Sequence, residues 1–184
     1  MTKTEQRVAL AKDVIKQLTK KELRAVKGEY VSGPLSKAAR QLNDISEYSE
    51  SGSFIYPNEN LDMRNLINNQ LKAKTCTVCV KGALFLAHIL RNDKVTLDEF
   101  INVELGNLRD KEASCPIPAF TPRQLDEIEM LYESDGFFRG RVINWSDNDI
   151  KKFKTIRKRL PSKPDERLKA IMRRIIKNKG RSII

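Results

Sequence analysis

Two cysteines, Cys76 and Cys79, stand in a Cys-x-x-Cys spacing, which suits either thiol–disulfide chemistry or metal binding. At the start of a helix, the first thiol would have a lowered pKa and could act as a redox group. A zinc site needs four ligands, and Cys115 supplies only a third. His88 is too distant, because nine residues along one helix put it about 13 Å from Cys79. The apolar neighbours favour a third interpretation, in which both cysteines are small core residues.

The single histidine of the chain, His88, restricts the catalytic chemistry that is possible. A cysteine protease or a serine hydrolase needs a histidine near its nucleophile, and His88 lies on the same expected helix as the cysteines. No glycine-rich phosphate-binding pattern occurs. The acidic pair Asp126 and Glu129 has the spacing of a solvated helix surface. We therefore expect no enzymatic activity, no catalytic residue, no bound metal and no cofactor.

The chemistry that the sequence does offer is cationic and lies near the C-terminus. Residues 139–184 carry sixteen Lys/Arg against four Asp/Glu, a net charge of +12 in a chain whose total is +11. Residues 1–40 carry +6, and residues 41–138 carry −7. This asymmetry suggests a polyanionic partner, either nucleic acid or an acidic protein surface, and the alternative is a charged surface that only keeps the protein in solution.

Two amphipathic helices are expected in this basic stretch, over 147–160 and 164–178, with a break at Pro161 and Pro164. Each has an apolar stripe that would pack inward, so that its cations would face solvent and could bind phosphates. Arginine adds a bidentate phosphate geometry that lysine lacks. The candidate residues for binding nucleic acid or another partner are Lys151, Lys152, Lys154, Arg157, Lys158, Arg159, Arg173, Arg174 and Lys177.

Two other features bear on nucleic-acid binding. Ala39 and Asn43 have the spacing of the first helix and turn of a helix-turn-helix. Where the recognition helix would follow, however, Glu47 and Glu50 would repel phosphate. Three aromatic residues upstream of the two basic helices could stack on bases, although we favour core packing for them: Phe137, Phe138 and Trp145.

The elements that must position these residues are mainly helices. Apolar residues at 3–4 spacing predict a first helix over about 4–20, with a stripe of Val8, Ala11, Ile15 and Leu18. The apolar run Cys76–Leu90 predicts a central buried helix. Thr121 with Gln124 forms a capping box, and Ser146 is a second N-cap. Gly180 is expected to end the last helix.

These elements predict a mainly α fold, a single compact helical domain with a small β-hairpin near residues 22–32. Residues 46–60 read as a loop. Residues 1–138 would form the helical body, and residues 139–184 a basic C-terminal helical hairpin packed on it or appended to it. The odd number of cysteines and the absence of a signal-peptide pattern or a membrane-length apolar run predict a cytoplasmic protein without membrane contact. The oligomeric state is left open.

Three stretches of the chain resemble a loose group of uncharacterised small proteins from phages, prophages and bacteria. They are RVALAKDV at 7–14, CTVCVKGALF at 76–85 and ERLKAIMRRIIKN at 166–178. The resemblance implies an origin in a mobile element, and with it an inhibitor that binds a host protein or defence complex. The residues themselves predict a non-enzymatic protein that binds nucleic acid through its cationic C-terminal helices.

Overall fold

The structure is a computed structural model that describes four stretches of the chain and three short strands elsewhere. The described residues are 1–27, 75–91, 117–133 and 145–181, together with the backbone of 31–32, 47–48 and 54–55. This part of the chain contains five helices and a few strands of two or three residues. The predicted mainly α fold is therefore confirmed. The helix-turn-helix-like segment 35–43, Glu50, Cys115, Phe137 and Phe138 lie outside the described residues.

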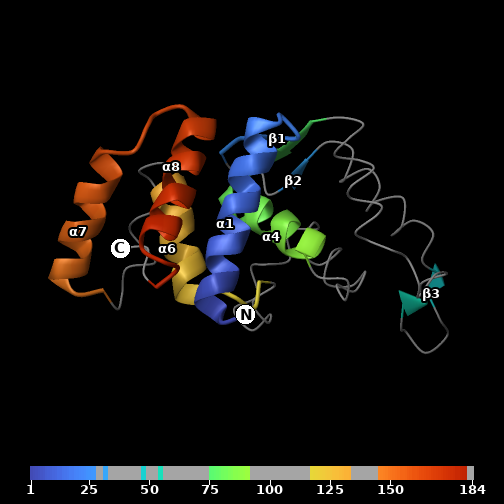
Figure 1. Cartoon of the computed structure of the whole chain (residues 1–184), viewed down its shortest axis with the longest axis horizontal. Coiled ribbons are helices and arrows are strands. Elements are labelled where there is room, and N and C mark those ends of the chain that lie inside the picture. Colours follow the sequence, from blue (N-terminus) through green and yellow to red (C-terminus); the bar gives the residue numbers. More distant parts are fainter. Residues whose placement is uncertain are drawn as a thin grey trace.

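The five helices lie side by side along the long axis of the molecule, with α7 at one end (Figure 1). A single cluster of buried apolar side chains includes residues from all five of them. The boundary expected at residue 138 stays a prediction, because residues 134–144 are not described. The helices are α1 (Lys3–Thr19), α4 (Val80–Arg91), α6 (Pro122–Tyr132), α7 (Asp147–Lys158) and α8 (Pro164–Lys177).

The predicted helix starts are confirmed where a polar cap marks them. The Thr121 hydroxyl accepts the backbone N–H of Gln124 at 3.2 Å, and the Gln124 side chain accepts the N–H of Thr121 in return. The Ser146 hydroxyl accepts the N–H of Asp149 at 3.2 Å, one turn into α7. Such caps satisfy N–H groups that the first turn of a helix leaves without partners.

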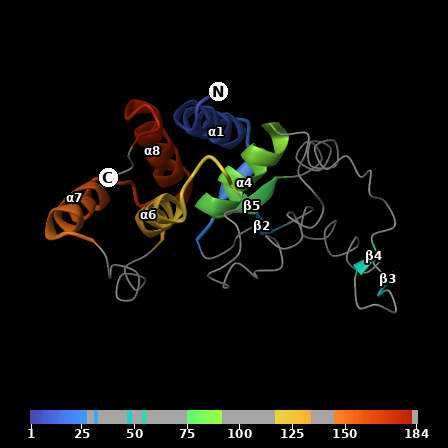
Figure 2. The ribbon, with the colours of Figure 1, turned by 90° about the horizontal axis from the view of Figure 1, so that it is seen from below.

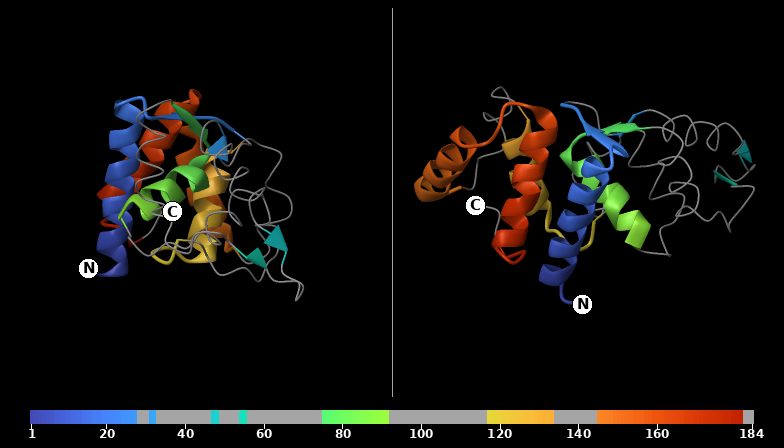
Figure 3. Two further views of the ribbon diagram at one scale, coloured as in Figure 1. Left: turned by 90° about the vertical axis from the view of Figure 1, so that its right-hand side faces the viewer. Right: turned by 45° about the horizontal axis from the view of Figure 1, so that its top comes forward.

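The first and last helices of this fold, α1 and α8, run antiparallel and side by side (Figures 1 and 3). Near the start of α8, the Asp165 carboxylate accepts the backbone N–H of Ala25, which follows α1, at 2.6 Å. At the other end, Arg7 of α1 donates to the carbonyl oxygen of Gly180 at 2.8 Å. The two helices are thus joined by polar contacts at both ends and by apolar packing between them.

The apolar stripe of α1 differs from the one expected. Val8 and Ile15 are only half-buried, while Leu10 and Val14 are fully buried. The buried face is therefore rotated toward Arg7, which is 8% exposed. The rotation follows from where α8 and α4 lie, since packing against neighbouring helices decides which face is covered.

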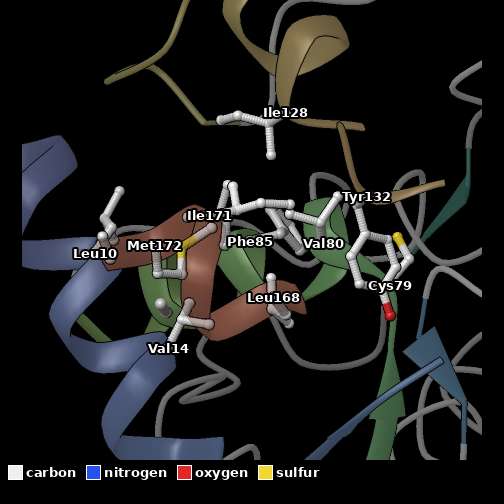
Figure 4. Packing of buried hydrophobic residues seen from close by; sticks show 14 of the residues in the cluster. Leu10, Val14, Cys79, Val80, Phe85, Ile128, Tyr132, Leu168, Ile171 and Met172 are labelled. Atoms are coloured by element: carbon white, nitrogen blue, oxygen red, sulfur yellow. The ribbon is translucent and has the colours of Figure 1, made fainter. Parts of the chain in front are cut away.

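Helix α4 is the central buried helix that the sequence predicts, but it starts later than expected. Cys76–Val78 is a strand, β5, and the helix begins at Val80. A short apolar run has no periodicity that separates strand from buried helix, which explains the error. Figure 4 shows Val80 and Phe85 of α4 among side chains of α1, α6 and α8. Phe85 is 1% exposed.

Strand β5 is the middle strand of a small sheet with the order β1-β5-β2. It pairs in parallel with β1 (Leu23–Ala25) and antiparallel with β2 (Val31–Ser32), which are seen beside it in Figures 1 and 2. The expected hairpin over 22–32 is therefore wrong, because its two arms do not pair with each other. Turn signals between two strands are local and carry no information about a later strand that inserts between them.

A second, two-stranded antiparallel sheet joins β3 (Glu47–Tyr48) to β4 (Phe54–Ile55). It lies at the opposite end of the long axis from α7 (Figures 1 and 2). The sequence predicted a loop over 46–60, and this is wrong at these four residues. Pairings of two residues leave almost no alternating pattern in a sequence rich in turn-forming residues.

The C-terminal end of α1 offers a test of backbone strain. Lys21 follows the cap residue with φ of 60°, and the N–H of Glu22 reaches the carbonyl of Gln17 at 3.0 Å, as in a Schellman motif. A residue with a Cβ is strained in this left-handed conformation by about 1 kcal/mol relative to glycine. Lys21→Gly should therefore raise the melting temperature by about 2–4 °C.

The matched control for this prediction is Lys20→Gly, one residue earlier. Lys20 is also exposed but has right-handed helical angles, φ −78° and ψ −3°. Glycine gains nothing there and adds flexibility to the unfolded chain, so this variant should melt at the same temperature or lower. A Lys21→Gly protein that melts no higher than the wild type would show that the left-handed turn carries no strain.

Candidate nucleic-acid interface

Helix α7 holds five of the nine candidate residues, with a sixth, Arg159, at its C-terminal cap, and seven of its twelve residues are exposed. Phe153 is its one buried side chain, 0% exposed, and it contacts the ring of Trp145 edge-on at 5.2 Å between centroids. Ile150 and Ile156, predicted as part of the inward stripe, are only half-buried. Because Trp145 packs against the core cluster, the expected core role of this residue is confirmed.

The exposed cations of α7 form two rows along the helix. Helical periodicity aligns the first row, Lys151, Lys154 and Lys158, at intervals of three and four residues. The second row consists of Lys152 and Arg159, which are seven residues apart and lie on the other side of the exposed face. Neither row has an ion pair with an acidic side chain of the described residues. Both rows are therefore available to an anionic partner.

Helix α8 adds two exposed candidates, Arg173 and Lys177, four residues apart on its outer face. The opposite face is in the core, where Leu168, Ile171 and Met172 are 0% exposed (Figure 4). The predicted inward stripe of this helix is confirmed at these positions.

The remaining two candidates, Arg157 and Arg174, differ from the other seven because they are half-buried. Arg157 donates to the carbonyl oxygen of Glu133 at 3.2 Å, and Arg167 donates to that of Tyr132 at 3.3 Å. Both carbonyls belong to the C-terminal end of α6, where cations offset the helix dipole. Burial lowers the pKa of the Arg174 guanidinium. Arg157 thus helps to stabilise the C-terminal end of α6.

The acidic residues of the basic stretch are confined to the first turns of α7 and α8. Carboxylates at these ends stabilise each helix through its dipole. Asp149 also approaches Arg123 of α6 at 3.6 Å, and Asp165 binds the end of β1. Downstream of these first turns, no further acidic residue follows on either helix: Lys151 and Lys152 lie one turn after Asp147 and Asp149, and Lys169 pairs with Glu166 at 3.0 Å.

Helix α6 is joined to its neighbours by charged contacts that the sequence did not reveal. Asp126 and Glu129, expected to be solvated, both contact Lys81 of α4, at 3.4 and 2.9 Å. On its other side, Arg123 approaches Asp149 of α7 at 3.6 Å and also donates to Glu127, within α6, at 3.1 Å. Burial of Glu127 raises the pKa of its carboxyl group. These contacts hold α6 between the central helix and α7.

Two of the three cysteines, Cys76 and Cys79, lie in the described residues, and both are buried. Burial raises the pKa of the Cys79 thiol to about 11, whereas a redox site needs a lowered pKa. Tyr132 lies beside it (Figure 4), and its buried hydroxyl has no hydrogen-bond partner among the described residues. The described ranges contain no cluster of three potential metal ligands. These surroundings fit the interpretation of core packing.

Comparisons with known proteins assign the chain to no family, because no family model, curated protein or solved structure matches it. Among the described helices, none is long and apolar enough to cross a membrane. Within the part of the chain that the structure describes, the two cation rows of α7 are the largest group of exposed like charges on one helix.

Proposed function

We propose that the protein binds nucleic acid through the exposed cations of α7 and α8 and catalyses no reaction. The observation that carries this proposal is the character of α7, a helix of twelve residues with one buried side chain and two rows of exposed cations. The cost of leaving so many like charges together is offset when phosphates approach them. We place this activity in the cytoplasm, or in the host cytoplasm if the chain is encoded by a phage.

Binding of this kind would depend steeply on salt. Each cation that neutralises a phosphate releases condensed counterions, and the logarithm of the affinity falls by about 0.7–0.9 per contact for each tenfold rise in salt. The exposed candidates that would make these contacts are Lys151, Lys152, Lys154, Lys158, Arg159, Arg173 and Lys177. Arg157 and Arg174 are left out of the set because they are half-buried.

The proposal predicts a loss of affinity when the first row is removed. In the triple variant of Lys151, Lys154 and Lys158 to Ala, binding should weaken about tenfold or more at about 50 mM salt. The slope of log affinity against log salt should fall by about 2–3. Fluorescence anisotropy with labelled DNA and RNA, single-stranded and duplex, at about 50 and about 200 mM salt measures both quantities.

The matched control is the triple variant of Lys3, Lys12 and Lys16 to Ala, in α1. These lysines are also exposed, and their removal changes the net charge by the same amount. The control should keep nearly all of the affinity. The proposal fails if the wild type binds none of the nucleic acids at low salt, or if the two triple variants lose affinity equally. A protein captured from host lysate after nuclease treatment, and lost in the α7 variant, would instead support an inhibitor of a host protein.

A further inference from the structure

We infer that α7 enters the major groove of duplex DNA, with its two cation rows contacting the two phosphate backbones. This inference rests on the proposed function and narrows it to one class of nucleic acid. Three observations carry it: the position and size of α7, the division of its cations into two rows, and the neutral polar residues that lie between them.

The first observation is the place of α7 in the molecule. It forms one end of the long axis, beyond α8 and α6 (Figures 1 and 2). Only Phe153 is fully buried, so most of the circumference of the helix is solvated. Twelve residues span about 18 Å, and a helix with its side chains is about 10–12 Å wide. The major groove of B-DNA is about 12 Å wide and admits a helix of this size.

The second observation is the spacing of the two rows. Positions on a helix advance by about 100° per residue, so Lys151 and Lys158 lie on one side of the exposed face and Lys152 and Arg159 on the other. A helix that lies in a groove has a phosphate backbone on each side. Cations in two rows match that arrangement, whereas a single central row would match one strand.

The third observation concerns the centre of the exposed face, between the rows. Asn148 and Thr155 lie there, seven residues apart, and both are exposed. The Thr155 hydroxyl already donates to the carbonyl of Lys151 at 2.9 Å, which leaves its methyl group for apolar contact. An asparagine can bind the major-groove edge of adenine, and a threonine methyl can contact that of thymine. The centre of the face therefore suits base edges.

Other nucleic acids fit this helix less well. The major groove of duplex RNA is deep and narrow, and a helix cannot enter it. The minor groove of B-DNA is about 6 Å wide, half of what α7 needs. Single strands are usually held by aromatic platforms, but Phe153 is buried and packs on Trp145. Duplex DNA is thus the occupant whose shape and charge both match.

The test compares the whole protein on a DNA duplex of about 21 base pairs, the RNA duplex of the same sequence, and the separated DNA strands. The DNA duplex should bind about tenfold tighter than either of the others. Methylation interference locates the groove, since methyl groups at guanine N7 block the major groove and those at adenine N3 block the minor groove. Interference should occur at guanine N7.

A variant at the centre of the face gives a second readout. Thr155→Glu places a carboxylate between the rows and should weaken binding to the DNA duplex about tenfold or more. Gln6→Glu, an exposed position on α1, adds the same charge far from α7 and should bind like the wild type. Asn148→Asp should also weaken binding, and an acid in the first turn stabilises the helix, so this variant remains folded.

The possible outcomes separate the inference from the proposed function. Equal affinity for the RNA duplex or single strands, or interference at adenine N3 alone, would overturn insertion in the major groove. If the triple variant of Lys151, Lys154 and Lys158 still weakened binding in those cases, the proposed function would stand. If the wild type bound none of the three probes, both would fall.

Discussion

Replacement of Arg7 by methionine is expected to lower the free energy of unfolding by about 3 kcal/mol, or the melting temperature by about 6–12 °C. The guanidinium donates from Nε to the carbonyl of Ala119 at 2.5 Å and from a terminal nitrogen to that of Gly180 at 2.8 Å. It also lies 5.8 Å from the centre of the Phe120 ring. Arg7 thus ties α1 to the residues before α6 and to those after α8.

The expected size of this destabilisation follows from the two buried carbonyl groups that lose their donor. Methionine fills much of the same volume, but the two carbonyls lose a charge-assisted donor in a buried position. Removal of the charge recovers part of the loss, because burial already disfavours it and lowers the pKa of Arg7. Arg7→Lys should also destabilise the fold, since an ammonium group lacks the planar fork that reaches both acceptors.

Thermal and urea unfolding followed by circular dichroism measure the Arg7 effect. The matched control is Arg24→Met on β1, where the arginine is exposed, and this change should remain within about 0.5 kcal/mol of the wild type. Equal stability of the Arg7→Met and Arg24→Met proteins would show that the two carbonyl contacts contribute nothing to the fold.

Gly180→Ala should destabilise the fold to a similar extent, by about 3 kcal/mol. Gly180 has φ of +70°, a conformation that costs a residue with a Cβ about 1 kcal/mol or more. A Cβ at this position would lie 2.3 Å from the carbonyl oxygen of Thr4 in α1. Because this neighbour is backbone in the first turn of a helix, α1 and the end of α8 must move apart to relieve the overlap.

Lys179→Ala is the control for this second prediction. Lys179 also has a positive φ, 53°, but its side chain is exposed, and alanine there keeps the same backbone strain as lysine. Its unfolding free energy should therefore be close to that of the wild type. If Gly180→Ala and Lys179→Ala unfolded at the same urea concentration, close approach of the chain to Thr4 would not be the reason for glycine.

Features encoded locally could be predicted from the sequence, and those made by distant residues could not. The caps at Thr121 and Ser146 and the inward stripe of α8 need only neighbouring residues, and all are confirmed. The pairing of β1 with β5 joins strands about fifty residues apart, and no short pattern encodes it. That the lysines of α7 face solvent was also predicted from the periodicity of this helix.

Two arginines show which structural roles the sequence could have revealed and which it could not. Arg7 lies three, four and seven residues before Leu10, Ala11 and Val14, so its position on the buried face could have been read from the spacing. Arg157 looked like one more surface cation. Its contact is with the end of α6, 24 residues earlier in the chain, and no local pattern around Arg157 encodes that contact.

The antiparallel pairing of α1 with α8 also determines when the core can form during synthesis of the chain. During translation α1 is synthesised before α8, its main packing partner, which follows roughly 150 residues later in the chain. Contacts between such distant segments form slowly, because a long loop must close before they yield any stabilisation. Until α8 arrives, Leu10, Val14 and much of α4 lack their cover. The nascent chain therefore exposes these core residues until α8 has been synthesised, and exposed apolar surface of this kind is prone to aggregate.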